Sequence, residues 1–308
     1  MKAKYKTLFG PVPSRRLGRS LGIDVTPEKT CSFDCLFCQC GKTLHRATDR
    51  SELVPFDAVC AEMEQWLAED GQADVITFAG SGEPTLYSRL GELIAFIKQK
   101  TDVPVILLTN GTLLHRPDVR DEAAKADIVK ISLSAWDDAS FQAVNRPAPG
   151  ISFEQTVQGE QAFRKQFSGG LWLEVFLMAG INDTPEQVKK IAAIAETIRP
   201  DKIHLNTAVR PPAETSVRPV AEKTIRSFCD LFTPRAEVIA SFRSAPAAGS
   251  AAVSGDTLAD LIHRHPATAE QLAAICGADA GAVRTALGPL VAAGRLQMEM
   301  RDGDRYYK

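Results

Sequence analysis

Long apolar runs and a dominant sign of charge are both absent from this sequence. None of its apolar stretches approaches the ~20 residues that a membrane-spanning helix needs. Residues 1–6 are charged and no apolar stretch follows them, which argues against a secretory signal. We therefore expect a cytoplasmic protein without a membrane partner.

The near-neutral charge gives no whole-chain argument for nucleic acid. The formal net charge is −2, whereas a strongly basic chain would have indicated nucleic acid or a membrane surface. A local basic patch could still bind RNA. The hydrophobic fraction of 44% is typical of a globular protein, and 308 residues suffice for one large domain and one small domain.

The cysteines are few but clustered. There are seven, and four of them lie between Cys31 and Cys40. A disulfide framework is typical of smaller, secreted chains. The cluster therefore indicates metal or redox chemistry.

Strand-like apolar runs alternate with amphipathic helical stretches. We expect strands over residues 20–25, 74–79, 103–109, 127–134, 171–178 and 202–207. We expect helices over residues 56–67, 86–100, 153–167 and 185–198 and near 221–232. This alternation predicts an α/β fold with a parallel sheet, and six βα units are too few for a closed eight-fold barrel. An open, partial (β/α)6 TIM-like barrel fits.

Polar residues follow one face of the later strands. Lys130, Ser132 and Ser134 alternate with apolar residues, as do Lys202, His204 and Asn206, and Glu174 lies between Trp172 and Phe176. Because successive strand residues point to opposite faces, these groups share one side of the sheet. We expect that side to be a wet or ligand-filled lumen, the alternative being strand-end charges in solvent.

The composition changes after residue 240. Residues 241–255 are rich in Ala, Ser and Pro and are typical of a linker. Residues 256–263, 268–276 and 280–293 have helical patterns, and residues 296–300 and 305–307 predict a hairpin with an Asp302-Gly303 turn. This order is that of a winged helix. The predicted domains are thus residues 1–240, a linker at 241–255, and a small C-terminal winged-helix domain at 256–308.

Cys31, Cys35 and Cys38 carry the strongest chemical signal. Their i, i+4, i+7 spacing lets three thiolates on one short loop converge on one inorganic cluster. A [4Fe–4S] cluster normally takes four thiolates, so three leave one iron open, as catalysis requires. Zinc is the alternative, with His45 or Cys40 as a fourth ligand.

The motif resembles a known family signature. CxxxCxΦC, with aromatic Phe37 before the last cysteine, is similar to the signature of the radical S-adenosylmethionine (SAM) superfamily. Residues 80–85, Gly-Ser-Gly-Glu-Pro-Thr, resemble that family's GEP element, and a partial barrel is its fold. Residues 9–18 and 27–31 resemble a subgroup of Fe–S oxidoreductases related to wyosine tRNA-base synthases. The resemblance covers about residues 5–240.

The resemblance implies two cofactors, a [4Fe–4S] cluster and SAM, and a set of residues that contact them. Cys31, Cys35 and Cys38 would be the cluster ligands and catalytic centre, Phe37 would lie near the adenine, and Gly80, Gly82 and Glu83 of the GEP element would meet the SAM amino group. Further contacts implied at the same site are Pro84, Ser132, Ser134, Arg146, Gly180 and Asn182. Helix caps, turns and surface charge explain the last five as well.

The substrate is left open by the sequence. Lys130, Glu174, His204 and Asn206 are candidate substrate contacts, and Arg15, Arg16 and Arg19 could bind an anionic group. Wyosine synthases are expected to carry a second cluster on N-terminal cysteines, whereas no cysteine precedes Cys31 here. Cys60, Cys229 and Cys276 are expected to be ordinary buried thiols, and we assign no role to Cys40.

Three functions remain open. The first is a radical SAM enzyme that acts on a macromolecule such as a tRNA base. The second is a radical SAM enzyme that modifies a peptide or small molecule and uses the C-terminal domain for docking. The third is a non-catalytic Fe–S regulator that binds DNA, with residues 280–293 as its recognition helix. Either enzyme would need a flavodoxin- or ferredoxin-type electron donor.

Overall fold

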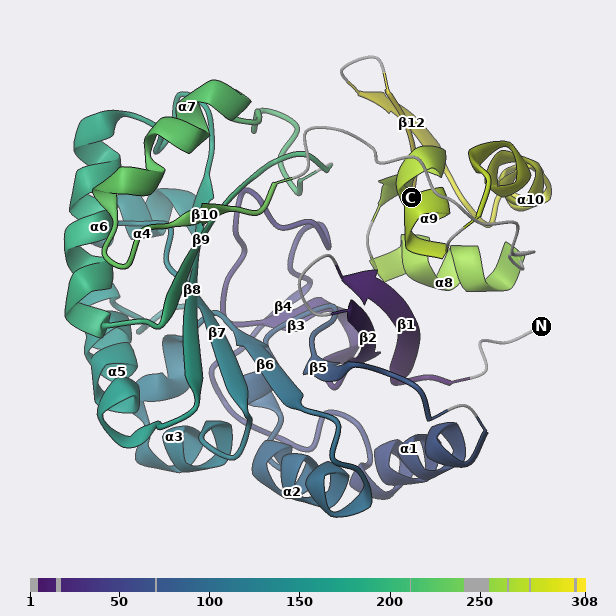
Figure 1. The fold of residues 1–308 in the computed structure, drawn as a ribbon, viewed down its shortest axis with the longest axis horizontal. Helices are drawn as coiled ribbons and strands as arrows, with labels where there is room; N and C mark the ends of the chain where they lie inside the picture. Colours follow the sequence, from purple (N-terminus) through teal and green to yellow (C-terminus); the bar gives the residue numbers. More distant parts are fainter. Residues whose placement is uncertain are drawn as a thin grey trace.

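The computed structural model describes residues 5–14, 18–69, 71–210, 212–240, 255–264, 266–276, 278–301 and 304–308. Figure 1 shows a curved sheet with α1, α2, α3, α5 and α6 along its outer side. Within the described ranges, no helix combines the length and the apolar composition of a membrane span.

An eight-stranded sheet with the order β1-β2-β5-β6-β7-β8-β9-β10 forms the larger unit. Neighbours from β2 to β10 pair in parallel, and β1 is antiparallel to β2. The predicted α/β fold with an open, mostly parallel sheet is confirmed. The strands are β1 Leu8–Ser14, β2 Gly18–Ile23, β5 Val75–Phe78, β6 Val105–Thr109, β7 Ile128–Ser132, β8 Gly170–Leu177, β9 Lys202–Thr207 and β10 Glu237–Val238.

Helices connect the parallel strands, and a pair of short strands follows β2. The helices are α1 Phe56–Glu69, α2 Leu90–Lys100, α3 Pro117–Ala123, α4 Asp138–Val144, α5 Phe153–Gln166, α6 Pro185–Ile198 and α7 Glu222–Ser227. Four 3-10 turns lie at η1 Pro27–Lys29, η2 Pro84–Leu86, η3 Thr112–His115 and η4 Cys229–Leu231. The short parallel pair is β3 Thr30–Cys31 and β4 His45–Arg46.

Local sequence explains where several helices begin. Thr184 caps α6, since its side chain accepts from the Gln187 N–H while the Gln187 side chain accepts from the Thr184 N–H. Pro185 occupies the first turn, where the missing N–H costs nothing. Asp137 caps α4 in the same reciprocal way with Ser140.

The structure differs from the sequence prediction at several elements of this unit. Strand β1 was not expected, because Gly10, Pro11 and Pro13 weaken a strand pattern; as an edge strand it tolerates them. The helix predicted over residues 86–100 begins only at Leu90, after the 3-10 turn that starts at Pro84. The helix predicted over residues 221–232 ends at Ser227 and is followed by η4.

The C-terminal residues form a second unit with its own apolar core. Its elements are α8 Gly255–Arg264, β11 Ala267–Thr268, α9 Ala269–Cys276, α10 Ala280–Ala292, β12 Met298–Arg301 and β13 Asp304–Tyr307. Leu258, Leu272 and Leu287 are fully buried at its centre. The predicted linker ends one residue too late, because Gly255 begins α8; residues 241–254 and the Asp302-Gly303 turn lie outside the described residues.

This unit packs against the larger one at the edge of the sheet. Helices α8 and α9 contact β1, beside which Figure 1 shows them. The Tyr306 hydroxyl donates to the Val209 carbonyl oxygen at 3.2 Å, and Val209 follows the end of β9. The second unit is therefore tied to the carboxyl-end side of the sheet, where ligands bind in parallel α/β folds.

Candidate functional site

A cavity of about 250 Å³ lies where β5, β6 and β7 end. Its walls come from the loops after β2, β5 and β6 and from the inner faces of β7 and β8. The lining residues are Cys31, Phe33, Cys35, Cys38, Thr43, Gly82, Glu83, Leu108, Thr109, Asn110, Lys130, Ser132 and Glu174. All three cysteines of the sequence motif thus border one space.

Backbone hydrogen bonds from the end of α4 hold the cysteine loop. The Asp34 N–H donates to the Asn145 carbonyl at 3.0 Å, and the Leu36 N–H donates to the Val144 carbonyl at 3.0 Å. Buried Phe33 anchors the loop by packing edge-on against Phe141, with ring centroids 5.2 Å apart. The turn after α4 therefore supports the loop that carries the thiols.

Each cysteine sulfur of the motif accepts a hydrogen bond from a side chain of another segment. Asn110 Nδ2 lies 3.6 Å from Cys31 Sγ, and Asn145 Nδ2 lies 3.4 Å from Cys35 Sγ. Lys29 Nζ lies 2.8 Å from Cys38 Sγ. Hydrogen bonds of this kind favour the thiolate over the thiol. Sequence reasoning missed all three donors.

The three thiols differ in acidity. Burial raises the pKa of Cys31 to about 12 and also raises the pKa of Cys35. In contrast, a hydrogen bond from the Cys40 thiol and the nearby Lys29 ammonium lower the pKa of Cys38 to about 5. Of the three thiols, Cys38 is therefore the one whose pKa is shifted towards the thiolate, which is the metal-binding form of cysteine.

Gly80 and Gly82 are required by close packing between loops. A methyl group at Gly82 would lie 1.7 Å from the Thr30 carbonyl oxygen, and one at Gly80 would lie 2.2 Å from Asp24 Cγ. The Asp24 carboxylate accepts from the Ser81 N–H at 3.0 Å and from its hydroxyl at 2.7 Å. The GEP loop is thus pressed onto the segment that leads into Cys31.

The carboxylate of Glu83 is buried and held by the protein. It accepts from the Thr109 hydroxyl at 2.6 Å, from the Asn110 N–H at 2.7 Å, and from both the N–H and the hydroxyl of Thr85. Desolvation raises its pKa in spite of these bonds. Glu83 lines the cavity, but its carboxylate ties the GEP loop to the end of β6.

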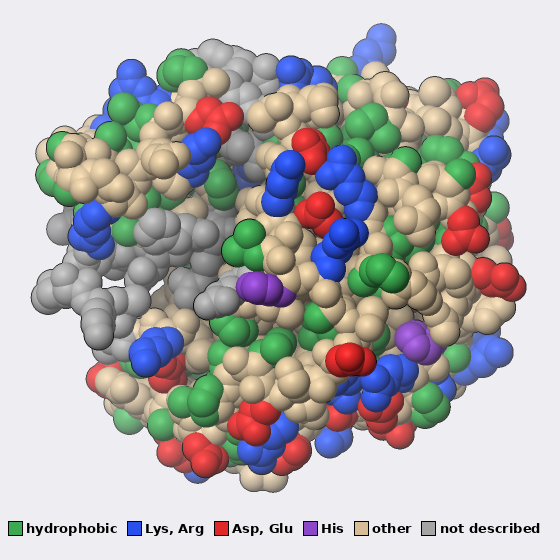
Figure 2. All heavy atoms as spheres, turned by 180° about the vertical axis from the view of Figure 1, so that it is seen from behind, with side chains coloured by type: hydrophobic (Ala, Val, Ile, Leu, Met, Phe, Trp, Pro, Cys, Tyr) green, Lys and Arg blue, Asp and Glu red, His purple; other side chains and the backbone are tan. Residues whose placement is uncertain are grey.

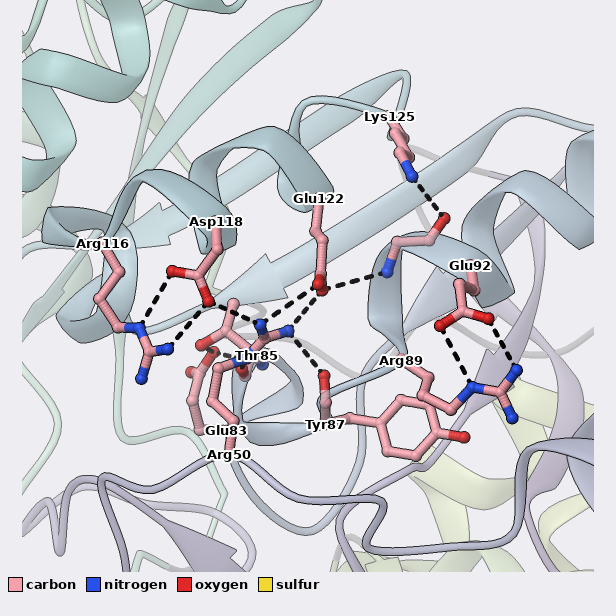
Figure 3. A network of polar contacts seen from close by, with 11 residues as sticks. Arg50, Glu83, Thr85, Tyr87, Arg89, Glu92, Arg116, Asp118, Glu122 and Lys125 are labelled. Atoms are coloured by element: carbon pink, nitrogen blue, oxygen red, sulfur yellow. Dashed lines mark hydrogen bonds and ion pairs between the residues drawn. The ribbon is translucent and has the colours of Figure 1, made fainter.

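Arg50 also holds this loop, as Figure 3 shows. Its nearly buried guanidinium donates to the Thr85 carbonyl at 2.8 Å and to the Tyr87 carbonyl at 2.9 Å. The same group pairs with Glu122 and Asp118 of α3. The hydrogen bonds and ion pairs of Arg50 thus fix the turn after Glu83. No local sequence pattern indicated this network.

The inner faces of β7, β8 and β9 supply a polar wall. Lys130 forms an ion pair with Glu174, and Asn206 Nδ2 donates to Glu174 Oε1 at 2.8 Å. Of the polar residues predicted to share one side of the sheet, Lys130, Ser132 and Glu174 line the cavity. His204 lies deeper, almost fully buried and edge-on to Trp172 at 5.4 Å.

Ser134 and Asn182 have structural roles at the ends of β7 and β8. The side-chain amide of Asn182 donates to the Ser134 carbonyl at 3.0 Å and to the Phe176 carbonyl at 2.9 Å. The Ser134 hydroxyl accepts from the Phe176 N–H at 3.1 Å. Their side chains join strand ends, which is the turn role left open by the sequence.

The remaining predicted cofactor contacts lie outside the set of cavity-lining residues. Phe37 stacks on Phe176, with ring centroids 4.4 Å apart. The Arg146 guanidinium donates to Glu214 at 2.7 Å. Gly180 is a positive-φ turn residue, and Pro84 is buried at the start of η2.

Other candidate residues are explained by local contacts. Arg19 pairs with Asp74 at the surface, whereas Arg15 and Arg16 lie outside the described residues. His45, one of the residues considered as a fourth zinc ligand, is exposed. In the described part of the chain, no three His, Cys, Asp or Glu side chains are grouped to hold a single metal ion. Cys60 and Cys229 are buried, as expected, and Cys276 is half-buried.

Comparisons with known proteins agree with this geometry. The model of the radical SAM superfamily matches residues 25–195. A protein named GTPase Obg from Brachyspira hyodysenteriae is 35% identical over 305 residues, which cover 98% of this chain and 45% of that one. The chain thus spans under half of that relative.

Two further comparisons concern a sequence relative and a solved structure. A UPF0026 protein of Synechocystis sp. is 38% identical over 213 residues, covering 68% of this chain and 78% of its own length. A solved structure of TYW1 with a lysine–pyruvate adduct has a TM-score of 0.52 at 19% identity, covering 71% of this chain and 74% of that one. At this identity, the structural likeness concerns the fold alone.

Proposed function

Because the chain belongs to the radical SAM superfamily, whose members use a [4Fe–4S] cluster and SAM, we propose that Cys31, Cys35 and Cys38 hold such a cluster beside a SAM site. The observation that carries this proposal is that all three cysteines border one cavity. Each of their sulfurs also accepts a hydrogen bond from the protein. Three thiolate ligands leave one iron open, which is where SAM would bind.

The donor set fits this cofactor. Asn110 and Asn145 supply neutral N–H groups to two sulfurs, and Lys29 supplies a charged one to the third. Such hydrogen bonds are among the factors that set the reduction potential of Fe–S centres. A bound cluster, reduced by one electron, would supply the reductive cleavage of SAM to methionine and a 5′-deoxyadenosyl radical, which would abstract hydrogen from the substrate.

The residues of the chain hold and enclose this chemistry. Gly82 brings the GEP backbone to the cavity wall without a side chain, where we propose it meets the SAM amino group. Ser132 offers a hydroxyl on the β7 wall. The ion pair of Lys130 and Glu174 forms the adjoining wall, where we place the substrate.

We propose that the substrate is a macromolecule, with a tRNA base as the first candidate; this rests on the sequence resemblance. The C-terminal unit supports docking of a large substrate, because its helices followed by a hairpin have the order of a winged helix. Its charges are mixed, because Arg284 of α10 pairs with Glu270. Basic and acidic side chains are also interspersed over the centre of the face that Figure 2 shows. A peptide is therefore the alternative that the assay must separate.

The experiment is anaerobic reconstitution, reduction with dithionite, addition of SAM, and measurement of 5′-deoxyadenosine. Cys35→Ala should abolish the product. Cys60→Ala is the matched control, because Cys60 is a buried thiol on α1 that does not border the cavity. A flavodoxin or ferredoxin should replace dithionite.

Two readouts decide the outcome. Iron and sulfide in the wild-type protein, with 5′-deoxyadenosine that rises on addition of tRNA, would support both parts of the proposal. A rise with peptide instead would replace the substrate class. Bound zinc without sulfide, or a reducible cluster that yields no 5′-deoxyadenosine with any addition, would refute the enzyme proposal.

A further inference from the structure

Lys29 is a buried lysine directly against the cysteine loop. It is the last residue of η1 and is only 8% exposed, although lysine is among the residues least often buried. Its ammonium nitrogen lies 2.8 Å from Cys38 Sγ. Burial removes hydration from the charge and rotamer freedom from the stem, so the partner must offset both losses.

The backbone of Lys29 adds a second cost. Its φ of 57° lies in the left-handed region, which is unfavourable for a residue with a Cβ. Its carbonyl accepts from the Leu44 N–H at 3.3 Å, so this backbone conformation is fixed by the return of the chain beside the cysteine loop. Glycine would adopt this conformation more easily, so the presence of lysine here indicates a functional role for its side chain.

The charge of Lys29 distinguishes it from the other sulfur donors. Cys31 and Cys35 accept from the neutral amides of Asn110 and Asn145. Lys130 also borders the cavity, but it is paired with Glu174. Of the side-chain nitrogen donors described at the three cysteines, Lys29 is therefore the one that brings a positive charge.

We infer that Lys29 is a positioning residue that stabilises negative charge at Cys38 and makes the bound cluster easier to reduce. This rests on the proposed function, because it requires a cluster on the three cysteines. Reduction adds one electron from a low-potential donor and breaks no bond, so the site gains one negative charge. A hydrogen-bonded cation at a ligand sulfur favours the more negative state.

The test compares the reduction of reconstituted Lys29→Met, Lys29→Gln and Lys29→Arg with that of the wild type. Lys42→Met is the matched control, because Lys42 lies on the same loop with a side chain that is 67% exposed. Iron and sulfide content is measured first. The reduced fraction is then followed by electron paramagnetic resonance at potentials poised with dithionite and mediators.

In Lys29→Met, the ratio of reduced to oxidised cluster at a fixed potential should fall about tenfold. The ratio should fall similarly in Lys29→Gln, whereas in Lys29→Arg and Lys42→Met it should stay close to the wild-type value. If the neutral variants lose the cluster but Lys29→Arg retains it at the wild-type potential, the charge is also required and the inference stands.

A fully loaded Lys29→Met with the wild-type ratio would overturn the inference. The loss of the cluster from Lys29→Arg as well as from the neutral variants would also overturn it, because shape rather than charge would then be required. If the wild-type protein holds no cluster, the proposed function itself fails. Cluster content thus separates the two failures.

Discussion

Gly82→Ala should be strongly destabilising, because the added methyl group meets backbone. It would lie 1.7 Å from the Thr30 carbonyl oxygen, and relief requires the GEP loop to move away from the cysteine loop. That movement stretches the Gly82 N–H bond to Thr26 Oγ1, now 2.9 Å, and the Glu83 N–H bond to the Thr30 carbonyl, now 3.1 Å. Overpacking and two weakened hydrogen bonds together predict a loss of about 2–5 kcal/mol.

The assay is urea unfolding followed by circular dichroism, with Gly80→Ala as the comparison. The methyl group at Gly80 meets the Asp24 carboxylate, which is a side chain and can shift more easily than backbone, so we expect a smaller loss of about 1–2 kcal/mol. The order of the two variants is the sharper test. If the free energy of unfolding of Gly82→Ala lies within about 0.5 kcal/mol of the wild-type value, the two loops are not packed as described. The same holds if Gly82→Ala loses less stability than Gly80→Ala.

Two further predictions concern other parts of the molecule. Glu160 is buried, its Oε2 has no hydrogen-bond partner in the described structure, and desolvation raises its pKa well above 4.5. The folded state then holds this proton more tightly than the unfolded state does, so the resulting stability is full below the unfolded pKa and falls as pH rises towards the folded pKa. In urea unfolding, the free energy of unfolding of Glu160→Gln should rise relative to that of the wild type from about pH 5 upward. Parallel pH profiles of the two free energies would contradict this. Tyr306→Phe removes the bond to the Val209 carbonyl and should lower the free energy of unfolding by about 0.5–1.5 kcal/mol; no change would mean that the hydroxyl does not tie the two units together.

The regular elements were largely predictable because their patterns are local. Strand β9 and helix α6 have the predicted bounds, and β6, β7 and β8 differ by only a few residues. The short helices α3 and α4 were not predicted, since seven residues give too few turns for a 3.6-residue period to be recognised. Buried strands in a parallel sheet, in contrast, stand out as apolar runs.

Two of the three sulfur donors were not predictable, because they are distant in sequence from the cysteines that they contact. The bond from Asn110 to Cys31 spans 79 positions, and that from Asn145 to Cys35 spans 110. Nothing in the local sequence distinguishes these amides from that of Asn182, which donates to two backbone carbonyls. A polar side chain in a turn serves whichever partner the fold brings to it.

Asn110 shows how the loops of the site are joined. Its N–H donates to Glu83, and its side-chain amide donates to Cys31 and to Ser32. It therefore links the GEP loop, the cysteine loop and the end of β6 through one residue. A shift of the GEP loop would therefore be transmitted to Cys31 through two hydrogen bonds of Asn110, one from its N–H to Glu83 and one from its side-chain amide to the Cys31 sulfur. We therefore infer that the GEP element supports the cysteine loop as well as forming a wall of the cavity. This role explains why the Glu83 carboxylate is hydrogen-bonded to Thr109 and Asn110 of the protein.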